Sequence, residues 1–275
     1  MMRSAPSDGG KPAAPRATPF TPKGDRPPLF FLHIPKTSGS SINAFLSSLY
    51  GAQNFIRHAE YRLPKLVSGG EPTLAVDAVS AHVPLCRWRL LPGTDAYARV
   101  TILRDPWARL VSHINWVDRF NHGEPLPGGV TAPAVARVVA TMAETDFEDE
   151  SSLLHLMQVV AEEPHFTAFD NMQVRMLLTV GGPRATFRTL QPTDAQEALQ
   201  ELAQFAVVGI CEDQSRFQSA LMDMLDIQAV VTPLHENPGQ KLAIQRDNAV
   251  ARAVLAPWYA LDQELYDGVR AARGL

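Results

Sequence analysis

The first residues whose types and spacing could carry chemistry lie in the stretch 35–41. It reads Pro-Lys-Thr-Ser-Gly-Ser-Ser and stands between an apolar run over 29–34 and an amphipathic segment over 42–50. This order predicts a buried strand, a loop and a helix. The N-terminus of a helix presents free backbone N–H groups and the positive end of its dipole. We therefore expect the loop to bind a phosphate group.

The side chains of this loop suit the same task. Lys36 supplies a mobile positive charge, and Gly39 lets a ligand approach the backbone closely. Four hydroxyl groups add hydrogen-bond donors: Thr37, Ser38, Ser40 and Ser41. The alternative is a serine-rich helix cap with a solvated lysine, which explains one or two of these residues but not the whole set.

A second group of residues follows another predicted strand, over 99–103. Arg104 comes at the carboxyl end of that strand, Asp105 is suited to cap a helix, and Pro106 fits the first helical position. Ser112 then lies almost two turns into the helix. An arginine and a hydroxyl placed in this way can hold one phosphate from two sides. The alternative gives Arg104 a structural salt bridge and places Ser112 on an ordinary helix face.

The elements around both loops alternate between short apolar runs and longer amphipathic stretches, which is typical of an α/β fold with a parallel sheet flanked by helices. Further strands are expected over 74–79 and 205–210. The middle third, roughly 118–200, contains no convincing strand and is predicted to be a helical insertion. Helices are expected near 106–120, 133–144, 150–161, 170–179, 193–204, 213–225 and 256–272.

Composition sets the organisation of the chain and excludes some functions. Residues 1–28 hold seven of the 22 prolines and predict a disordered leader, followed by one domain over 29–275. The net charge of −4 provides no overall positive field for nucleic acid or an anionic membrane. No apolar run approaches the roughly 20 residues that span a bilayer, so no membrane insertion is expected. The two cysteines, Cys86 and Cys211, are far apart in sequence, which favours a reducing compartment. The N-terminal segment has no apolar core of a secretory signal, so a cytoplasmic protein is expected.

Both loops together resemble a known family. The stretch 35–41 resembles the loop that holds the 5′-phosphosulfate of 3′-phosphoadenosine 5′-phosphosulfate (PAPS) in sulfotransferases. The stretch 104–112, Arg-Asp-Pro-x-x-Arg-x-x-Ser, resembles the motif that binds the 3′-phosphate of that nucleotide. They occur in the family's order, about 70 residues apart. The resemblance is to the carbohydrate-directed branch that includes the uronosyl 2-O-sulfotransferases, whose common fold is a P-loop-like α/β domain. Weaker similarities lie at 169–173, 208–212, 235–238 and 261–266.

This resemblance implies a set of roles. Lys36 would stabilise negative charge on the departing phosphate, while Ser40 and Ser41 would hold the 5′-phosphate together with Thr37, Ser38 and Gly39. Arg104 and Ser112 would fix the 3′-phosphate. PAPS would be the sulfuryl donor, the acceptor would be a carbohydrate or glycoconjugate hydroxyl, and no metal is needed. The chain is shorter than the animal enzymes and lacks their membrane anchor, so their Golgi location and substrates are not expected to apply.

The acceptor hydroxyl needs a general base, for which His82 is the first candidate. It follows the strand predicted over 74–79, in a segment that resembles the one supplying the base in related sulfotransferases. Ser80 stands where the uronosyl enzymes have a first histidine, so only the second is matched. A structural histidine at a strand end is the alternative. His58, Glu60 and His113 are reserve candidates, and the apolar flanks of His33 predict that it is buried.

Two further features bear on substrates. Residues 237–248, with Lys241 and Arg246, could form a flap over the nucleotide as the equivalent region does in relatives, or a solvated loop. Five arginines could line a groove for an acidic sugar, although scattered arginines usually lie on the surface: Arg57, Arg62, Arg87, Arg89 and Arg119.

Two other functions remain open from the sequence. A P-loop kinase or NTPase would carry Gly-x-x-x-x-Gly-Lys-Ser/Thr and a magnesium ligand, whereas here Lys36 precedes the glycine. A non-catalytic nucleotide- or glycan-binding protein would keep the pocket without the chemistry. The sequence gives no sign of a tight His, Cys or Asp cluster that would hold a metal.

Overall fold

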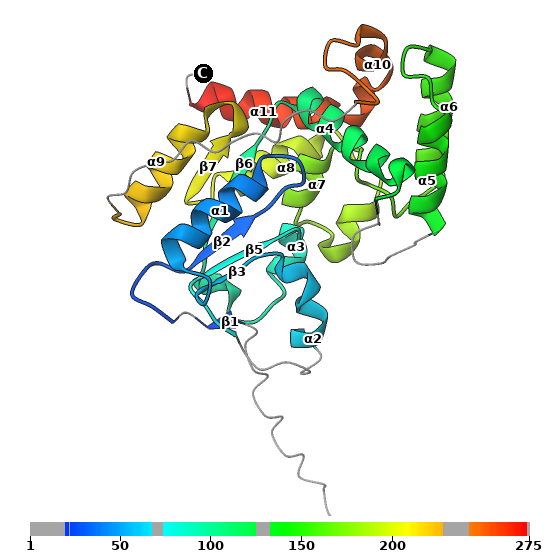
Figure 1. Cartoon of the computed structure of the whole chain (residues 1–275). Coiled ribbons are helices and arrows are strands. Elements are labelled where there is room, and N and C mark those ends of the chain that lie inside the picture. The colour runs from blue at the N-terminus through cyan, green and yellow to red at the C-terminus, as the bar shows by residue number, and fades with distance from the viewer. Residues whose placement is uncertain (1–19, 22, 68–73, 125–132, 228–241, 274–275) are drawn as a thin grey trace, which may run out of the picture.

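The protein is described by a computed structural model over residues 20–21, 23–67, 74–124, 133–227 and 242–273 (Figure 1). Its strands are β1 (Phe20–Thr21), β2 (Leu29–Leu32), β3 (Phe55–Ile56), β4 (Leu74–Ala75), β5 (Ala78–Ala81), β6 (Ala98–Leu103) and β7 (Val207–Ile210). Its α-helices are α1 (Gly39–Tyr50), α2 (Leu63–Val67), α3 (Leu85–Trp88), α4 (Pro106–Asp118), α5 (Pro133–Glu144), α6 (Glu150–Ala161), α7 (Met172–Leu177), α8 (Thr193–Leu202), α9 (Gln214–Met224), α10 (Ala249–Val254) and α11 (Ala260–Ala272). Short 3₁₀ helices are η1 (Ala59–Tyr61), η2 (Thr94–Ala96), η3 (Arg119–His122), η5 (Gly182–Phe187), η6 (Cys211–Asp213) and η7 (Ala256–Trp258).

A five-stranded, all-parallel sheet forms the centre of the molecule, in the order β3-β5-β2-β6-β7. This confirms the predicted α/β class. The connection that follows β2 leads toward β3 at one edge, whereas the connection that follows β6 leads toward β7 at the other. Ligands of such sheets bind in the crevice outside the carboxyl ends of two strands whose connections part in this way. Here the corresponding position at the carboxyl edge is between the loops that follow β2 and β6.

Both faces of the sheet are buried, which explains why its strands read as continuous apolar runs. Leu29 and Phe31 of β2 pack in one core with α1 and α9. Phe30 and Leu32 point to the opposite face and pack in a second core with α3, α7, α8 and α11. The domain is therefore a three-layer arrangement, with helices on both sides of the sheet (Figure 1).

The middle third of the chain forms a helical lobe, as predicted. Between β6 and β7, the described residues contain helices but no strand. α4, α5 and α6 pack with α10 around a third core, which includes Trp107, Leu156 and Trp258. In Figure 1 this lobe stands to one side of the sheet, and α4 joins it to the end of β6.

Two boundaries differ from the sequence prediction. The strand expected over 74–79 is divided, because β4 pairs with β1 in a separate two-stranded sheet and β5 begins only at Ala78. Asp77 lies between them, and its Oδ1 accepts hydrogen bonds from the backbone N–H groups of Lys23 (2.7 Å) and Gly24 (2.6 Å). Residues of the predicted leader thus contact the domain, whereas residues 1–19 lie outside the described part.

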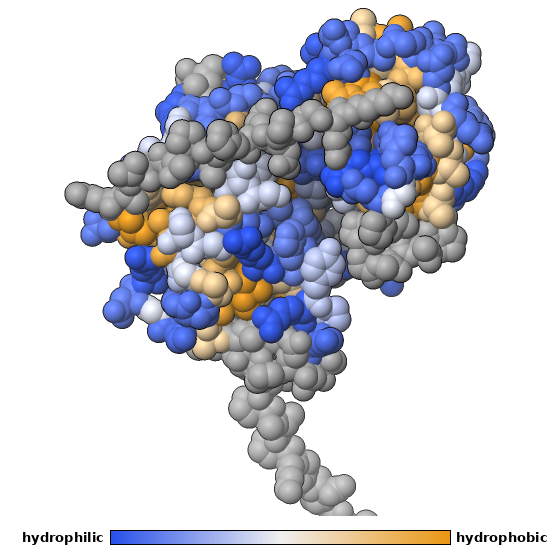
Figure 2. All heavy atoms as spheres, in the orientation of Figure 1, coloured by the Kyte–Doolittle hydropathy of each residue, from blue (hydrophilic) through white to orange (hydrophobic). Residues whose placement is uncertain are grey.

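None of the helices in the described residues combines the length and the apolar character needed to cross a bilayer. Figure 2 shows that, among the described residues on the face in view, apolar patches lie between hydrophilic ones.

Candidate functional site

The carboxyl edge of the sheet gathers most of the residues that the sequence indicates. Parallel strands all end at the same edge, so the segments that follow them meet there. The loop 33–41 follows β2, Arg104 follows β6 and His82 follows β5. His58 follows β3, and Cys211 follows β7.

The loop after β2 has the conformation of an anion-binding site. Lys36 (φ 71°) and Ser38 (φ 63°) are both in the left-handed region, and Ser38 is the N-cap of α1. Alternation of this kind turns successive N–H groups toward one point and forms a concave site for anions. Within the described residues, no backbone carbonyl accepts from the N–H groups of residues 36 to 40. These groups are therefore available to a ligand.

The hydroxyl groups of the loop divide into two classes. Thr37 is buried and its Oγ1 donates to the carbonyl of Ile34 (2.9 Å), while Oγ of Ser38 lies 2.7 Å from Sγ of Cys211. Both therefore have partners within the protein. Ser40 is exposed and Ser41 is half-buried, and neither hydroxyl has a partner among the described residues. The structure thus leaves the two serines that were expected to contact the 5′-phosphate free to do so.

Gly39 is required for a reason that the sequence does not reveal. A Cβ atom at this position would lie 1.7 Å from Nε2 of His33, so any side chain would displace the histidine ring. The residue thus permits a close approach, but the group that approaches is His33 of the protein itself.

Lys36 and Arg104 lie next to each other across the crevice. Nη1 of Arg104 donates to the carbonyl oxygen of Lys36 at 3.0 Å. Neither side chain has a carboxylate within salt-bridge distance among the described residues. Nζ of Lys36 lies 5.8 Å from the centre of the Trp116 ring on α4. Two cations without a carboxylate partner are costly unless an anion joins them, which points to an anionic ligand.

The pKa of Lys36 is lowered by burial and by the neighbouring cations. Desolvation is the largest effect that lowers its pKa, to about 8, followed by the positive charges of Arg104, Arg119 and Arg109. An anion bound beside it would favour the charged ammonium and raise that pKa again.

The loop after β6 is fixed by a polar network. Asp105 caps α4 as predicted, accepting from the N–H of Ala108 at 2.8 Å, and Pro106 is the first helical residue. The side-chain amide of Gln173 accepts from the Arg104 N–H (2.9 Å) and donates to the Arg104 carbonyl (3.0 Å). Glu212 accepts from the N–H of Asp105 (3.1 Å). The backbone of Arg104 is thus held from two sides.

A second, fully buried layer lies behind this loop. Nε of Arg109, the second arginine of the motif, is 3.8 Å from Oδ2 of Asp262, and both side chains are inaccessible to solvent. Asp262 also accepts from the N–H groups of Gln173 (3.2 Å) and Val174 (2.8 Å). Burial raises the pKa of Asp262 to about 6, although Arg109 acts in the opposite direction. Arg109 therefore joins α4 to α11 rather than facing the crevice.

Three of the four weaker sequence similarities coincide with this network, whereas the fourth, 235–238, lies outside the described residues. Gln173 belongs to 169–173, Glu212 to 208–212 and Asp262 to 261–266. Their role is to position the Arg104 loop, which the sequence could not reveal because each contact joins distant segments. Ser112 is half-buried in α4, and its hydroxyl has no partner among the described residues.

His82 lies beside the phosphate loop, as a base would need to. Its Nδ1 donates to the carbonyl oxygen of His33 (2.6 Å), and its backbone N–H donates to Glu60 (3.0 Å). Desolvation lowers the pKa of His82, whereas the Glu60 carboxylate and the hydrogen bond to His33 act to raise it. A neutral imidazole with Nε2 unprotonated is the form that can accept a proton.

The structure also assembles a cluster that the sequence did not predict. One ring nitrogen from each of His33, His58 and His82 lies within 4.8 Å of those of the other two. His58 was missed as a partner because β3, the strand before it, is only two residues long. The signal that could have found the cluster is a histidine just after each of three strands.

The remaining candidates lie elsewhere or face inward. His113 is fully buried, with Nδ1 3.1 Å from Nη1 of Arg109, and desolvation holds its pKa well below the usual range.

Residues 237–241 of the expected flap lie outside the described part. Residues 242–248 are attached to α4, since Asn115 donates to the Ile244 carbonyl (2.9 Å) and Trp107 to that of Arg246 (2.7 Å).

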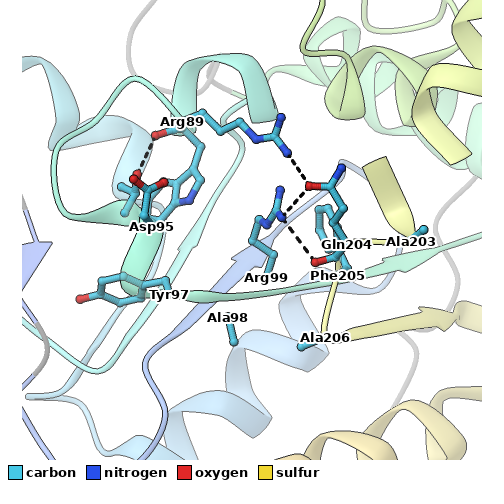
Figure 3. A pocket seen from close by; sticks show the side chains of 11 residues that line it. Arg89, Asp95, Tyr97, Ala98, Arg99, Ala203, Gln204, Phe205 and Ala206 are labelled. Carbon is cyan, nitrogen blue, oxygen red and sulfur yellow. Dashed lines mark hydrogen bonds between the residues drawn. The ribbon is translucent and has the colours of Figure 1, made fainter. Parts of the chain in front are cut away.

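The arginines expected to line an acceptor groove do not form one group. Arg119 is close enough to Lys36 to lower the pKa of the lysine. Arg57 instead donates a hydrogen bond to the Ser47 hydroxyl. Arg89 lines a different cavity of about 490 Å³ at the amino-terminal end of β6, together with Arg99 (Figure 3). That cavity is at the opposite edge of the sheet from Lys36 and Arg104.

Comparison with known proteins assigns no family. No protein-family model matches the chain, and no curated protein is similar enough to match it.

Proposed function

We propose that this protein is a PAPS-dependent O-sulfotransferase that acts on a hydroxyl group of a carbohydrate or glycoconjugate. The proposal depends above all on the contact between the two phosphate loops, in which Nη1 of Arg104 lies 3.0 Å from the Lys36 carbonyl. This contact shows that the two loops are adjacent, and adjacent anion sites suit a nucleotide with phosphates on both sides of one ribose. ATP has no 3′-phosphate, so the second site favours PAPS.

The residues at the crevice fit such a nucleotide. In the proposal, the N–H groups of residues 36 to 40 and the hydroxyls of Ser40 and Ser41 bind the 5′-phosphate. Arg104 and Ser112 bind the 3′-phosphate. The proposal is supported by the polar groups left without partners at the loop after β2, and neither cation forms a salt bridge among the described residues.

The proposed reaction is an in-line displacement at sulfur. The acceptor oxygen forms a new S–O bond while the bond from sulfur to the 5′-phosphate oxygen breaks, and adenosine 3′,5′-bisphosphate leaves. Lys36 neutralises the charge that grows on the departing phosphate oxygen, and His82 takes the proton of the acceptor hydroxyl at Nε2. Positioning and charge neutralisation supply most of the rate, as in phosphoryl transfer.

The kinase or NTPase alternative has less support from the site. It needs both a hydroxyl and a carboxylate to hold magnesium beside the phosphates. Ser40 or Ser41 offers a free hydroxyl, so the carboxylate is the group that distinguishes the two functions. The carboxylates that follow β6 and β7 already have protein partners: Asp105 caps α4, and Glu212 accepts from the Asp105 N–H and from the Tyr266 hydroxyl (2.9 Å). A binding protein without turnover is an outcome of the experiment below.

The test is to measure binding and transfer separately. Calorimetric titration with adenosine 3′,5′-bisphosphate in EDTA is expected to give a 1:1 complex, and Lys36→Ala and Arg104→Ala should each weaken it. Arg252→Ala, at an exposed arginine of α10, is the matched control. Transfer of radiolabelled sulfate from PAPS to a glycan and alcohol panel then tests catalysis. Binding without transfer, unaffected by His82→Ala, would identify a binding protein; preference for Mg·ATP would favour a kinase.

The proposal includes a reducing, cytoplasmic setting. Its support is that Cys86 and Cys211 are both free thiols. Localisation of a tagged full-length chain tests this part independently of the enzymology.

A further inference from the structure

Three histidines come together at the edge of the sheet for a topological reason. His33 follows β2, His58 follows β3 and His82 follows β5, and these three strands are neighbours. Leu32 pairs with Ala81, so His33 and His82 leave the sheet at the same level. Ile56 pairs with Val79, which brings His58 to the same edge. The register of the backbone therefore sets the cluster, with one ring nitrogen of each residue within 4.8 Å of those of the others.

The hydrogen bonds of the cluster prepare two of the rings to act as ligands. A carbonyl oxygen only accepts, so Nδ1 of His82 carries the proton that it donates to His33, and Nε2 keeps its lone pair. Glu60 plays the same part for His58, since its Oε1 accepts from Nδ1 at 3.0 Å. Metal-ligating histidines typically donate their second nitrogen to a carboxylate or a backbone carbonyl in this way.

The third histidine has an unsatisfied polar atom. His33 is 5% exposed, and its Nδ1 is buried without a hydrogen-bond partner among the described residues. A buried polar atom in this state is unfavourable unless something binds to it. The His33 and His82 rings also lie close together, with centres 3.9 Å apart.

The spacing is compatible with one metal ion after small movements. Zn–N bonds of about 2.0–2.1 Å in a tetrahedral site place two ligand nitrogens about 3.4 Å apart. Starting from separations of at most 4.8 Å, each nitrogen needs to move by less than about 1 Å. The His58 side chain is 42% exposed and can rotate, which also provides a route of entry from solvent.

We propose that His33, His58 and His82 form a binding site for one divalent transition-metal ion, with Zn²⁺ the best match and a fourth coordination position left open. Three imidazoles favour zinc, cobalt, nickel or copper over magnesium or calcium, which prefer oxygen ligands. Glu60 provides the nearby negative charge that offsets the cation.

The site has a consequence for catalysis that rests on the proposed function. The metal ion coordinates the Nε2 lone pair of His82, and the acceptor proton needs the same lone pair. Metal and proton transfer therefore compete, so zinc inhibits sulfuryl transfer and is not required for it.

The binding experiment uses the full-length chain, stripped of metal with EDTA, and Co²⁺ as a spectroscopic probe. We expect one equivalent to bind with the visible absorption of a tetrahedral site, and Zn²⁺ to displace it. His58→Ala should weaken binding at least tenfold, because it removes one of three ligands, whereas His155→Ala on the exposed face of α6 should not. Circular dichroism and thermal melting verify that both variants are folded.

Several results would overturn the site: failure of the folded wild-type protein to bind Co²⁺ or Zn²⁺ at micromolar concentrations, equal affinity in His58→Ala, or a thiolate-to-cobalt band that assigns the ion to a cysteine. No PAPS is present in this assay, so its failure is separate from failure of the proposed function. In an active preparation, inhibition by Zn²⁺ with the same midpoint as binding supports the competition with His82. Full activity at saturating Zn²⁺ would refute that competition.

Discussion

Arginines lie at both ends of β6, and they differ in whether a carboxylate is their partner. At the amino-terminal end, Arg89 donates to both carboxylate oxygens of Glu201 (3.0 and 2.5 Å), and Arg99 lies 3.9 Å from the same carboxylate. At the carboxyl end, Arg104 donates to a backbone carbonyl, and neither it nor Lys36 has a carboxylate partner in the described part of the chain.

This difference separates a structural ion pair from a ligand site. A cavity of about 490 Å³ opens at the amino-terminal end, where it is lined by Arg89, Arg99 and Gln204 (Figure 3). The positive charges of Arg89 and Arg99 are offset by two carboxylates, Glu201 and Asp95, so an anion gains little there. At the carboxyl end neither cation forms a salt bridge, and the backbone N–H groups of residues 36 to 40 have no backbone acceptor among the described residues. This difference in charge balance is the reason for placing the proposed nucleotide site at the carboxyl end.

The largest effect is expected from removing the ammonium group beside the departing phosphate. Lys36→Ala should lower kcat for sulfuryl transfer by about 10²–10³-fold, because it removes one preorganised charge from the transition state. Steady-state kinetics with radiolabelled PAPS measure this. Lys65→Ala, at an exposed lysine of α2, is the control. Unchanged kcat in Lys36→Ala would remove the lysine from the mechanism.

The next largest effect is expected on nucleotide affinity, and it distinguishes the 3′-phosphate from the 5′-phosphate. Arg104→Ala should lower the affinity for adenosine 3′,5′-bisphosphate by about 10–100-fold, which is the range for hydrogen bonds to a charged group. Adenosine 5′-phosphate, which lacks the 3′-phosphate, should bind both proteins almost equally. Calorimetric titration of the two nucleotides gives the comparison. Equal losses for both would show that Arg104 does not distinguish the 3′-phosphate.

The pH dependence of nucleotide binding follows from the pKa of Lys36. The ammonium form binds the anion, and in the free protein its pKa is lowered to about 8. Above that pH, binding must be accompanied by protonation, so affinity should fall close to tenfold per pH unit until the higher pKa of the complex is reached. Lys36→Arg should flatten the profile between about pH 8 and 10, because a guanidinium stays charged. A wild-type affinity that does not change over this range would contradict the shift.

The smallest effect on nucleotide affinity is expected at the amino-terminal end of β6. Glu201→Gln should lower the free energy of unfolding by about 1–2 kcal/mol, because it leaves Arg89 and Arg99 with weaker partners. The affinity for adenosine 3′,5′-bisphosphate should not change. Urea denaturation and calorimetry on the same samples measure both quantities. A marked rise or fall in nucleotide affinity would mean that the two ends of β6 do not have separate roles.

The sequence predicted the parts of the molecule that depend on local pattern. β2, β6 and β7 are apolar runs because both faces of the sheet are buried, and residues after such strands must meet at one edge. Lys36, Arg104 and His82 could therefore be placed together without coordinates. The cap Asp105 and the first helical residue Pro106 were also predicted, since both depend on neighbours in sequence.

Other features depend on contacts that no local pattern encodes. β3 is too short to give a periodic signal, so His58 could not be placed beside His33 and His82. The fit of Gly39 against the His33 ring depends on how α1 approaches the sheet. Gln173 reaches the Arg104 backbone across 69 positions in sequence, and only the packed structure reveals that it holds the second loop.

The central claim is that one nucleotide joins the two cations at the carboxyl end of the sheet. A crystal structure of the full-length protein with adenosine 3′,5′-bisphosphate tests it most directly. The account predicts the 5′-phosphate against residues 36–41 and the 3′-phosphate against the Arg104 guanidinium. Nucleotide bound in the Arg89 and Arg99 cavity, or held at the carboxyl end through one phosphate with Arg104 still turned to the Lys36 carbonyl, would contradict it.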